Sequence, residues 1–267
     1  MIELSRDQKL HLYEYGYVHI PEFVPKPLVK DALKAINSSI RKHLNFYSGQ
    51  VLNTEALCPD LKTDKRIWDL FNATGAHSLC ESALGKNKLL LSKNVQVALN
   101  FPISEDKPFG LDPHIDSFHP SKDGVSGKIT PFTAIAGIYL NELSEDWSGN
   151  FTVWPGTHRL FEQYFKNHKP DPDLKFGIPP VELPKPIQLK VKAGDLIFAH
   201  YQLAHDASAN ISEAIRYAIY FRMNHVDQGK EAVETLSDIW RYWDGMKDIT
   251  CKQELHTKKE LHTKKEL

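Results

Sequence analysis

The chain has 267 residues, with 33 Lys or Arg against 34 Asp or Glu, so its formal net charge is −1. Hydrophobic residues make up 41% and charged residues 25%, which is ordinary globular usage and argues against a disordered chain. The neutral charge balance, without a long run of Lys or Arg, argues against a general nucleic-acid-binding protein. The longest nearly apolar run, Pro131–Leu140, is far shorter than the roughly 20 residues that a membrane span needs.

Three cysteines, Cys58, Cys80 and Cys251, are far apart in the sequence and odd in number. This pattern fits neither a disulfide framework nor a zinc-knuckle spacing. The opening segment MIELSRDQKL has two acidic residues and no apolar stretch, so we expect no secretory signal. The sequence therefore predicts free thiols and a cytoplasmic protein.

The chain begins with a part that is predicted to be mainly helical. Ser5 is a suitable N-cap for a short amphipathic helix that ends at Gly16, and Tyr17–Ile20 follows as a brief strand. A second helix is indicated by apolar residues at four-residue steps: Leu28, Ala32, Ile36 and Ile40. A third helix is expected over about Asp64–Leu84, with Gly85 as its stop.

From Lys88 onward, short runs rich in Val, Ile, Phe, Tyr and Thr alternate with Gly, Pro, Asp and Ser. The predicted strands are Leu89–Phe101, Phe132–Leu140, Asn150–Trp154, Ile187–Val191, Asp195–Ala199 and Ile215–Phe221. No helix of comparable length is predicted between them, which favours a sandwich or jelly roll over a parallel α/β sheet. The proline-rich segment from about Phe165 to Pro186 is expected to be irregular.

Residues 1–252 are expected to form one domain, because no Gly/Ser-rich linker divides them. Its parts are a mainly helical cover at 1–87, a jelly-roll core at 88–225 and a C-terminal helical segment at 226–252. Ile239, Trp240 and Trp243 have helical spacing and are expected to pack the C-terminal segment on the barrel. Residues 253–267 include two successive copies of ELHTKK and are predicted to be an extended or disordered tail.

His114 and Asp116 are two residues apart in the segment Pro113–Asp116. On a strand, side chains two residues apart point to the same side, so both can reach one metal ion. His205 ends a predicted strand that can face this pair across a sandwich. Two imidazoles and one carboxylate form the facial triad of non-haem Fe(II) oxygenases, which leaves positions open for a 2-oxo acid and O₂.

Arg216 lies on the strand after His205 and is the fourth candidate. A 2-oxoglutarate molecule that chelates the metal leaves a distal carboxylate, and the planar guanidinium suits it. Arg216 shares one strand face with Ala218, Tyr220 and Arg222. A cation in the middle of such a strand is unfavourable without a partner. Arg216 is therefore either the co-substrate's partner or a member of an internal salt bridge.

The stretch from about Gln96 to Arg222 resembles the phytanoyl-CoA dioxygenase (PhyH) family of Fe(II)/2-oxoglutarate-dependent oxygenases. The residues that carry the resemblance are His114-x-Asp116, the segment GNFTVWPGTHR at Gly149–Arg159, and Gly194-Asp195 followed by His205, Asn210 and Arg216. The segment Tyr17–Val24 is also similar to the start of the family. The resemblance covers most of the chain apart from the repetitive tail.

This resemblance implies a mainly β fold with flanking α-helices, built on a double-stranded β-helix (jelly roll, cupin-like) core. It implies a catalytic iron bound by His114, Asp116 and His205. It also implies that Arg216 holds the distal carboxylate of 2-oxoglutarate.

Several other positions near these motifs also have expected roles. Gln96 and Asn100 match a Gln-x-x-x-Asn strand that supplies further co-substrate contacts in related enzymes; the alternative is that they are polar residues of a strand edge. Ala207 stands where some members have Ser, so that hydroxyl contact is absent or moved to Ser208. The other histidines near the motifs are expected to be structural: His158 as a hydrogen-bonded scaffold residue and His200 as a core residue.

The predicted function is hydroxylation of a small organic metabolite, with decarboxylation of 2-oxoglutarate to succinate and CO₂. Asp116 favours this outcome, because halogenating relatives replace the carboxylate with a small residue. O₂ is the oxidant, and ascorbate is expected to stimulate the reaction. The same iron centre could instead catalyse desaturation, cyclisation or epimerisation.

Two interpretations without catalysis are also open. They are a jelly-roll protein that only binds a metal or ligand, and a structural Zn²⁺ site at the same triad. The expected partner is a small-molecule substrate, and neither a nucleic acid nor a membrane is expected. The sequence does not indicate an oligomeric state.

Overall fold

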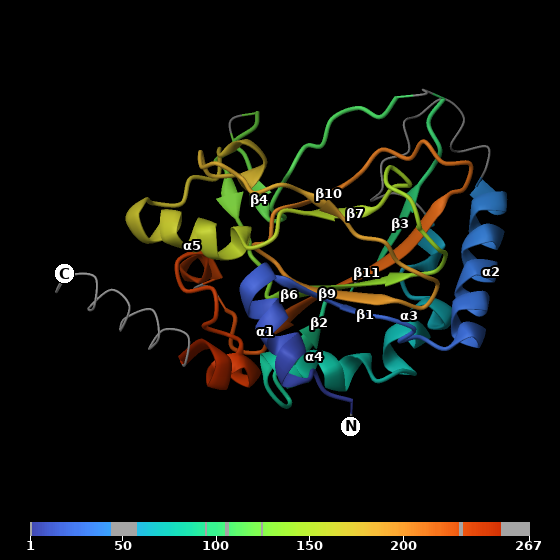
Figure 1. The fold of residues 1–267 in the computed structure, drawn as a ribbon, viewed down its shortest axis with the longest axis horizontal. Helices are drawn as coiled ribbons and strands as arrows, with labels where there is room; N and C mark the ends of the chain where they lie inside the picture. Colours follow the sequence, from blue (N-terminus) through green and yellow to red (C-terminus); the bar gives the residue numbers. More distant parts are fainter. Residues whose placement is uncertain are drawn as a thin grey trace.

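Two antiparallel sheets face each other at the centre of the protein (Figure 1). The computed structural model describes residues 2–43, 58–93, 95–104, 107–123, 125–229 and 232–251. The larger sheet has the order β1–β9–β6–β11–β2, and β3 also pairs with β11. Its strands are β1 (Tyr17–Ile20), β9 (Leu196–His200), β6 (Ala134–Tyr139), β11 (Arg216–His225), β2 (Leu89–Leu91) and β3 (Gln96–Asn100).

The smaller sheet has the order β10–β7–β8 and lies opposite the larger one (Figure 1). Its strands are β10 (His205–Ala207), β7 (Phe151–Val153) and β8 (Ile187–Gln188). A separate pair is formed by β4 (Phe118–His119) and β5 (Lys128–Ile129). Strands far apart in the chain therefore become neighbours, as the predicted sandwich or jelly roll requires.

The larger sheet is buried on both faces, and β6 shows how its side chains are divided. Ile135 and Tyr139 pack in the core between the two sheets. Ala134, Ala136 and Ile138 pack on the other face, in the core that the N-terminal helices contribute to. Because successive side chains of a strand point to opposite faces, a strand covered on both sides needs an unbroken apolar sequence. The burial of both faces of β6 therefore explains the nearly apolar run Pro131–Leu140 in the sequence.

The helices of the N-terminal part cover that outer face (Figure 1). They are α1 (Arg6–Tyr15), α2 (Lys26–His43), α3 (Lys65–Asn72) and α4 (Ala76–Leu84), with the 3₁₀ helix η2 (Pro59–Leu61) before α3. Both predicted ends of the first helix are confirmed. Ser5 and Gln8 form a reciprocal capping box, and Gly16 ends the helix with φ at 83°.

The helix predicted over about 64–84 is in fact two helices, α3 and α4. Thr74 is the local cause of the break. Its hydroxyl donates to the carbonyls of Leu70 and Phe71 and accepts from the amide of Ala76. A threonine side chain that bonds to nearby backbone groups competes with the helical hydrogen bonds, so one helix ends and the next begins around it. The predicted stop at Gly85 is confirmed.

A fifth helix, α5 (Thr157–Asn167), was missed in the sequence. It begins directly after Gly156, whose φ is 82°, and buries Phe161 and Phe165 on one side. Phe165 therefore belongs to a helix and not to the irregular segment that was predicted to begin there. The remainder of that segment contains the short 3₁₀ helix η3 (Lys175–Gly177).

The C-terminal part contains the short 3₁₀ helices η4 (Ala232–Leu236) and η5 (Asp244–Met246). Trp243 is 1% exposed and contacts the ring of Phe198 on the larger sheet, so the expected packing is present. The helical spacing predicted for Ile239, Trp240 and Trp243 is wrong, because these residues lie in the segment of turns between η4 and η5. The predicted tail at 253–267 lies outside the described residues. None of the helices in the described ranges is long and apolar enough to cross a membrane.

Candidate metal centre

His114 and His205 are brought together by backbone pairing between distant segments. The amide of each donates to the carbonyl of the other, at 2.9 and 3.0 Å. Directly paired residues of antiparallel strands have side chains on the same face, so both imidazoles point to one side. Their ring centroids are 4.5 Å apart. The segment around His114 thus continues the smaller sheet beyond β10.

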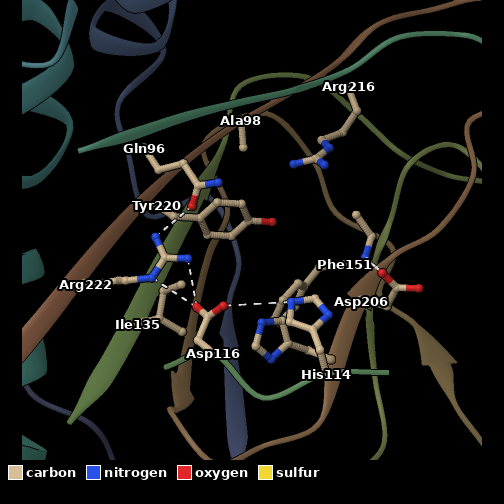
Figure 2. A pocket seen from close by; sticks show the side chains of 12 residues that line it. Gln96, Ala98, His114, Asp116, Ile135, Phe151, Asp206, Arg216, Tyr220 and Arg222 are labelled. Atoms are coloured by element: carbon tan, nitrogen blue, oxygen red, sulfur yellow. Dashed lines mark hydrogen bonds and ion pairs between the residues drawn. The ribbon is translucent and has the colours of Figure 1, made fainter. Parts of the chain in front are cut away.

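Asp116 completes a group of three side chains whose possible ligand atoms lie close together, and Figure 2 shows its carboxylate directed toward His114. One possible ligand atom from each of His114, Asp116 and His205 lies within 4.8 Å of the other two. In the part of the chain that the structure describes, no other group of three His, Cys, Asp or Glu side chains meets this condition. The predicted triad therefore has the arrangement needed to hold one metal ion.

The imidazole of His205 is oriented by the backbone. Its Nδ1 donates to the carbonyl of Leu203 at 2.9 Å, which leaves Nε2 as the atom with a free lone pair. Burial, together with the charge of His114, lowers the pKa of His205 to about 4. The ring is therefore neutral near pH 7, as a metal ligand must be.

The carboxylate of Asp116 is held by an arginine of β11. The Nε and Nη2 atoms of Arg222 both donate to Oδ2 of Asp116, at 3.0 and 2.8 Å. The other oxygen, Oδ1, lies 3.8 Å from Nε2 of His114. Burial by itself would raise the pKa of Asp116, but the charges of Arg222, His205 and His114 outweigh it and lower the pKa to about 2. The carboxylate is thus ionised throughout the physiological range.

A cavity of about 400 Å³ between the two sheets contains these groups. Its lining residues are Gln96, Ala98, His114, Asp116, Ile135, Phe151, His205, Asp206, Ala207, Arg216, Tyr220 and Arg222. They come from both sheets, including β3, β6 and β11 of the larger and β7 and β10 of the smaller. The cavity is large enough for a small organic molecule.

Arg216 lines this cavity and is only 2% exposed. Its Nε and Nη1 atoms are buried and have no hydrogen-bond partner among the described residues. In Figure 2 the guanidinium points into the space between β11 and the triad. A buried guanidinium with unused donors is unfavourable unless an anion occupies the cavity. The alternative of an internal salt bridge is not seen in the described part of the chain.

The two polar residues of β3 have different surroundings. Gln96 lines the cavity, and its Oε1 accepts from Nη1 of Arg222 at 2.7 Å. Asn100 does not line the cavity: its Nδ2 donates to the carbonyl of Ser208 at 2.9 Å. The structure thus brings Gln96 to the triad but leaves Asn100 tied to the segment after β10. Although both side chains lie on one strand face, only Gln96 reaches the cavity wall.

Some family members have a Ser hydroxyl at the position of Ala207, and Ser208 does not replace it in this protein. The Oγ of Ser208 is buried and accepts from the amide of Asn150 at 2.9 Å, away from the cavity lining. Tyr220 contributes a hydroxyl-bearing side chain to the cavity instead, and its hydroxyl lies 3.1 Å from that of Tyr139. Tyr220 was noted in the sequence only as a neighbour of Arg216 on the same strand face.

Arg222 is the main residue of the site that sequence reasoning missed. Arg222 follows Arg216 by six residues, an even number, so the alternation of a strand places both side chains on the same face. This spacing was the sequence signal that could have identified Arg222 as a residue of the site. The identity of its partners, Asp116 and Gln96, was not encoded in any local pattern. Asp206 was also missed: it lines the cavity, and its Oδ2 accepts from the amide of Asp112 at 2.8 Å.

The fold places the protein among double-stranded β-helix proteins, and comparison with known proteins defines its family. Residues 12–218 match the family described as phytanoyl-CoA dioxygenase (PhyH). This match includes His114, Asp116, His205 and Arg216. The chain belongs to the PhyH family, whose members are Fe(II)/2-oxoglutarate-dependent enzymes. No curated protein sequence matches the chain.

Solved structures of related fold include enzymes with different reactions. The epimerase SnoN, in complex with Fe³⁺, alpha ketoglutarate and nogalamycin RO, is 21% identical, with a TM-score of 0.58; the match covers 85% of this chain and 88% of that one. The carbocyclase SnoK from nogalamycin biosynthesis is 19% identical, with a TM-score of 0.55 and coverage of 86% and 90%. HygX from Streptomyces hygroscopicus, with nickel and 2-oxoglutarate bound, is 16% identical, with a TM-score of 0.50 and coverage of 84% and 88%.

Proposed function

We propose that the protein is an Fe(II)/2-oxoglutarate-dependent oxygenase that hydroxylates a small organic molecule. The observation that carries the proposal is the buried guanidinium of Arg216, with unused donors, in the same cavity as His114, Asp116 and His205. A metal-binding group and an anion-binding group in one cavity are what a chelating 2-oxo acid with a distal carboxylate requires.

The donor set fits Fe(II). Two neutral imidazoles and one carboxylate on one side of an ion form the facial triad, with the remaining positions open. Nε2 of His205 is free, and Oδ1 of Asp116 faces His114. When bound, iron would supply the oxidative chemistry: R–H, 2-oxoglutarate and O₂ give R–OH, succinate and CO₂.

The protein's own side chains bind and orient the reactants. Arg216 pairs with the distal carboxylate of 2-oxoglutarate, and Gln96 offers an amide to its other end. Ile135 and Phe151 provide apolar walls, which limit water around the reacting atoms. Ascorbate is proposed to keep the iron reduced, and the small number of cysteines, far apart in the sequence, supports a reducing, cytoplasmic location.

The outcome of the oxidation is the finer part of the proposal. The related structures include an epimerase and a carbocyclase, and the same ligand set serves hydroxylation, cyclisation, desaturation and epimerisation. The position of the substrate carbon decides among them. Mass spectrometry sorts these outcomes into three groups: hydroxylation adds one oxygen atom, desaturation or cyclisation removes two hydrogens, and epimerisation leaves the mass unchanged.

The first experiment is an anaerobic titration of the purified protein with Fe(II) and then with 2-oxoglutarate. We expect a visible charge-transfer band when both are bound, and succinate release on exposure to O₂ with ascorbate. A screen of metabolite extracts for compounds that increase succinate release then searches for the substrate. Wild-type protein that binds neither Fe(II) nor 2-oxoglutarate would overturn the proposal, and metal binding without the band would favour a structural Zn²⁺ site.

A further inference from the structure

Two arginines on the inward face of β11 line the same cavity but have opposite surroundings. Arg216 has buried donors without partners, whereas Arg222 makes three hydrogen bonds to two residues of the cavity wall. They are six residues apart, which corresponds to roughly 20 Å along a strand. Arg216 is therefore available to a ligand, and Arg222 is already engaged by the protein itself.

The contacts of Arg222 favour one oxygen of Asp116 over the other. Nε and Nη2 both donate to Oδ2, at 3.0 and 2.8 Å. Two charge-assisted hydrogen bonds draw electron density toward Oδ2 and occupy the space around it. Oδ1 is the oxygen on the side of His114, where the other ligand atoms lie. Oδ1 of Asp116 is therefore available to bind a metal, whereas Oδ2 is already occupied by Arg222.

The distinction matters because a carboxylate can bind a metal through one or both oxygens. In an octahedral centre with two histidines, a one-oxygen aspartate leaves three open positions, and a two-oxygen aspartate leaves two. A chelating 2-oxo acid takes two positions, so the third is needed for O₂. Anything that holds Asp116 to a single oxygen therefore preserves the position that the oxidant needs.

Arg222 also determines how Gln96 is turned. A guanidinium has only N–H donors, so the amide atom at 2.7 Å from Nη1 is the oxygen, Oε1. The NH₂ group of Gln96 is consequently directed away from Arg222, and Figure 2 shows it on the side of Tyr220. Gln96 can then donate to an anionic ligand in the cavity. A lysine, with a single nitrogen, cannot reproduce this forked contact to two side chains.

We propose that Arg222 is a positioning residue that restricts Asp116 to one-oxygen metal coordination and turns the Gln96 amide toward the co-substrate. The inference rests on the proposed function, because it concerns the same metal site. In this role Arg222 contacts Asp116, a ligand of the metal, and does not bind the metal itself.

The test uses the full chain loaded with Co(II) alone, which needs neither 2-oxoglutarate nor turnover. Protein with isotopically labelled aspartate is compared with and without Co(II) by infrared difference spectroscopy. The separation between the antisymmetric and symmetric carboxylate stretches is large for one-oxygen coordination and small for two-oxygen coordination. We expect the large separation in the wild type and the small one in Arg222→Met and Arg222→Lys. We also expect Co(II) affinity to fall by roughly 10–100-fold in both variants.

Two controls and a second test variant separate positioning from general damage. Arg66→Met removes an exposed arginine that pairs with Asp64 on the surface, and should change neither the affinity nor the spectrum. Gln96→Leu removes one contact of Arg222 but leaves its pair with Asp116, so it should keep the large separation. In a separate turnover assay with Fe(II), loss of the Gln96 amide should raise the KM for 2-oxoglutarate. Arg222→Lys retains the positive charge, so it remains informative if the Met variant does not fold.

The outcomes are distinguishable. Wild type that binds no divalent metal overturns the proposed function and this inference together. This inference alone is overturned if the wild type binds Co(II) with the large separation and both Arg222 variants show the same separation and the same affinity. A small separation in the wild type also overturns it. A switch from large to small separation on substitution of Arg222, without a switch in Gln96→Leu, supports it.

Discussion

Two pairs of histidine rings lie close together in the described part of the chain. The ring centroids of His114 and His205 are 4.5 Å apart at the cavity, and those of His158 and His200 are 5.4 Å apart in the interior. Burial, assisted by the charge of His114, lowers the pKa of His205 to about 4, and burial lowers the pKa of His200 to about 4 as well. A low histidine pKa therefore reports burial and does not distinguish the two pairs.

The groups around the rings do distinguish them. His200 uses both ring nitrogens inside the protein: Nε2 donates to the carbonyl of Ile239 at 2.9 Å, and Nδ1 accepts from the amide of Gln202 at 3.1 Å. Nε2 of His158 donates to the carbonyl of Tyr13 at 3.0 Å. Among the residues described, no carboxylate joins this pair to make a possible metal site. It is a packed pair, as expected from the sequence.

The cavity pair differs because its free ligand atoms converge with a carboxylate on open space. Nε2 of His205 and Oδ1 of Asp116 both face that space, and the same cavity contains the unpaired donors of Arg216. A candidate metal centre is thus recognised by unused polar atoms that converge with a carboxylate on one location. In the packed pair, three of the four ring nitrogens have protein partners, and Nδ1 of His158, which has none, belongs to no possible metal site among the described residues.

Removing one ring from each pair should give the largest contrast. His205→Ala should abolish Fe(II) binding and reduce succinate release to background, because one of three ligands is lost. His200→Ala should retain Fe(II) binding but lower the free energy of unfolding by about 2–4 kcal/mol, through the loss of buried contacts. Calorimetric Fe(II) titration and denaturant unfolding measure the two effects. Unchanged Fe(II) affinity in His205→Ala would contradict the assignment of the metal ligands.

Arg216→Met should change stability and binding in opposite directions. Loss of the guanidinium should weaken 2-oxoglutarate binding by about 100-fold, because the distal carboxylate is left without its partner. Without ligand, the variant should be more stable than the wild type by about 1–3 kcal/mol, because an unpaired buried charge is replaced by an apolar side chain. Melting curves with and without 2-oxoglutarate measure both effects. A ligand-free variant that is less stable than the wild type would argue for an internal partner of Arg216.

The pH dependence of stability should include a large contribution from the buried His200 of the packed pair. The pKa of His200 is about 4 in the folded protein against 6.5 for an ordinary histidine, so the unfolded state binds more protons between these values. Stability should therefore be complete above about pH 6.5 and fall as the pH decreases to about 4, by about 3 kcal/mol for this residue. Unfolding titrations across this range should show a smaller slope for His200→Gln. An equal slope would contradict a buried, neutral His200.

Gly16→Ala should have the smallest effect, and it should act beside the packed pair and away from the cavity lining. Gly16 has φ at 83°, and a Cβ added there would lie 2.7 Å from Nδ1 of His158. The left-handed backbone and the close contact should together lower the free energy of unfolding by about 1–3 kcal/mol. Fe(II) affinity should remain at the wild-type value, because the cavity is not involved. A change in Fe(II) affinity without a change in stability would show that the two pairs are coupled.

Much of the fold and part of the site follow from local patterns. The capped first helix with its end at Gly16, the strand Tyr17–Ile20 and the β-rich part after it were predicted, because caps and alternation depend on neighbouring residues. The division of the third helix at Thr74 was not, since a threonine is compatible with a helix until its side chain bonds to the backbone. The helix that begins after Gly156 was missed because its start has no side-chain N-cap to mark it.

The sequence by itself determined which residue types could meet at the cavity. The two-residue spacing of His114 and Asp116, and the placement of Arg216 and Arg222 on one strand face, follow from the alternation of a strand. Only the tertiary structure decided the partners: Arg222 with Asp116 and Gln96, and no partner for Arg216 in the described residues. Alternation specifies the face of a side chain, whereas the register between distant strands specifies what that side chain meets across the sheet.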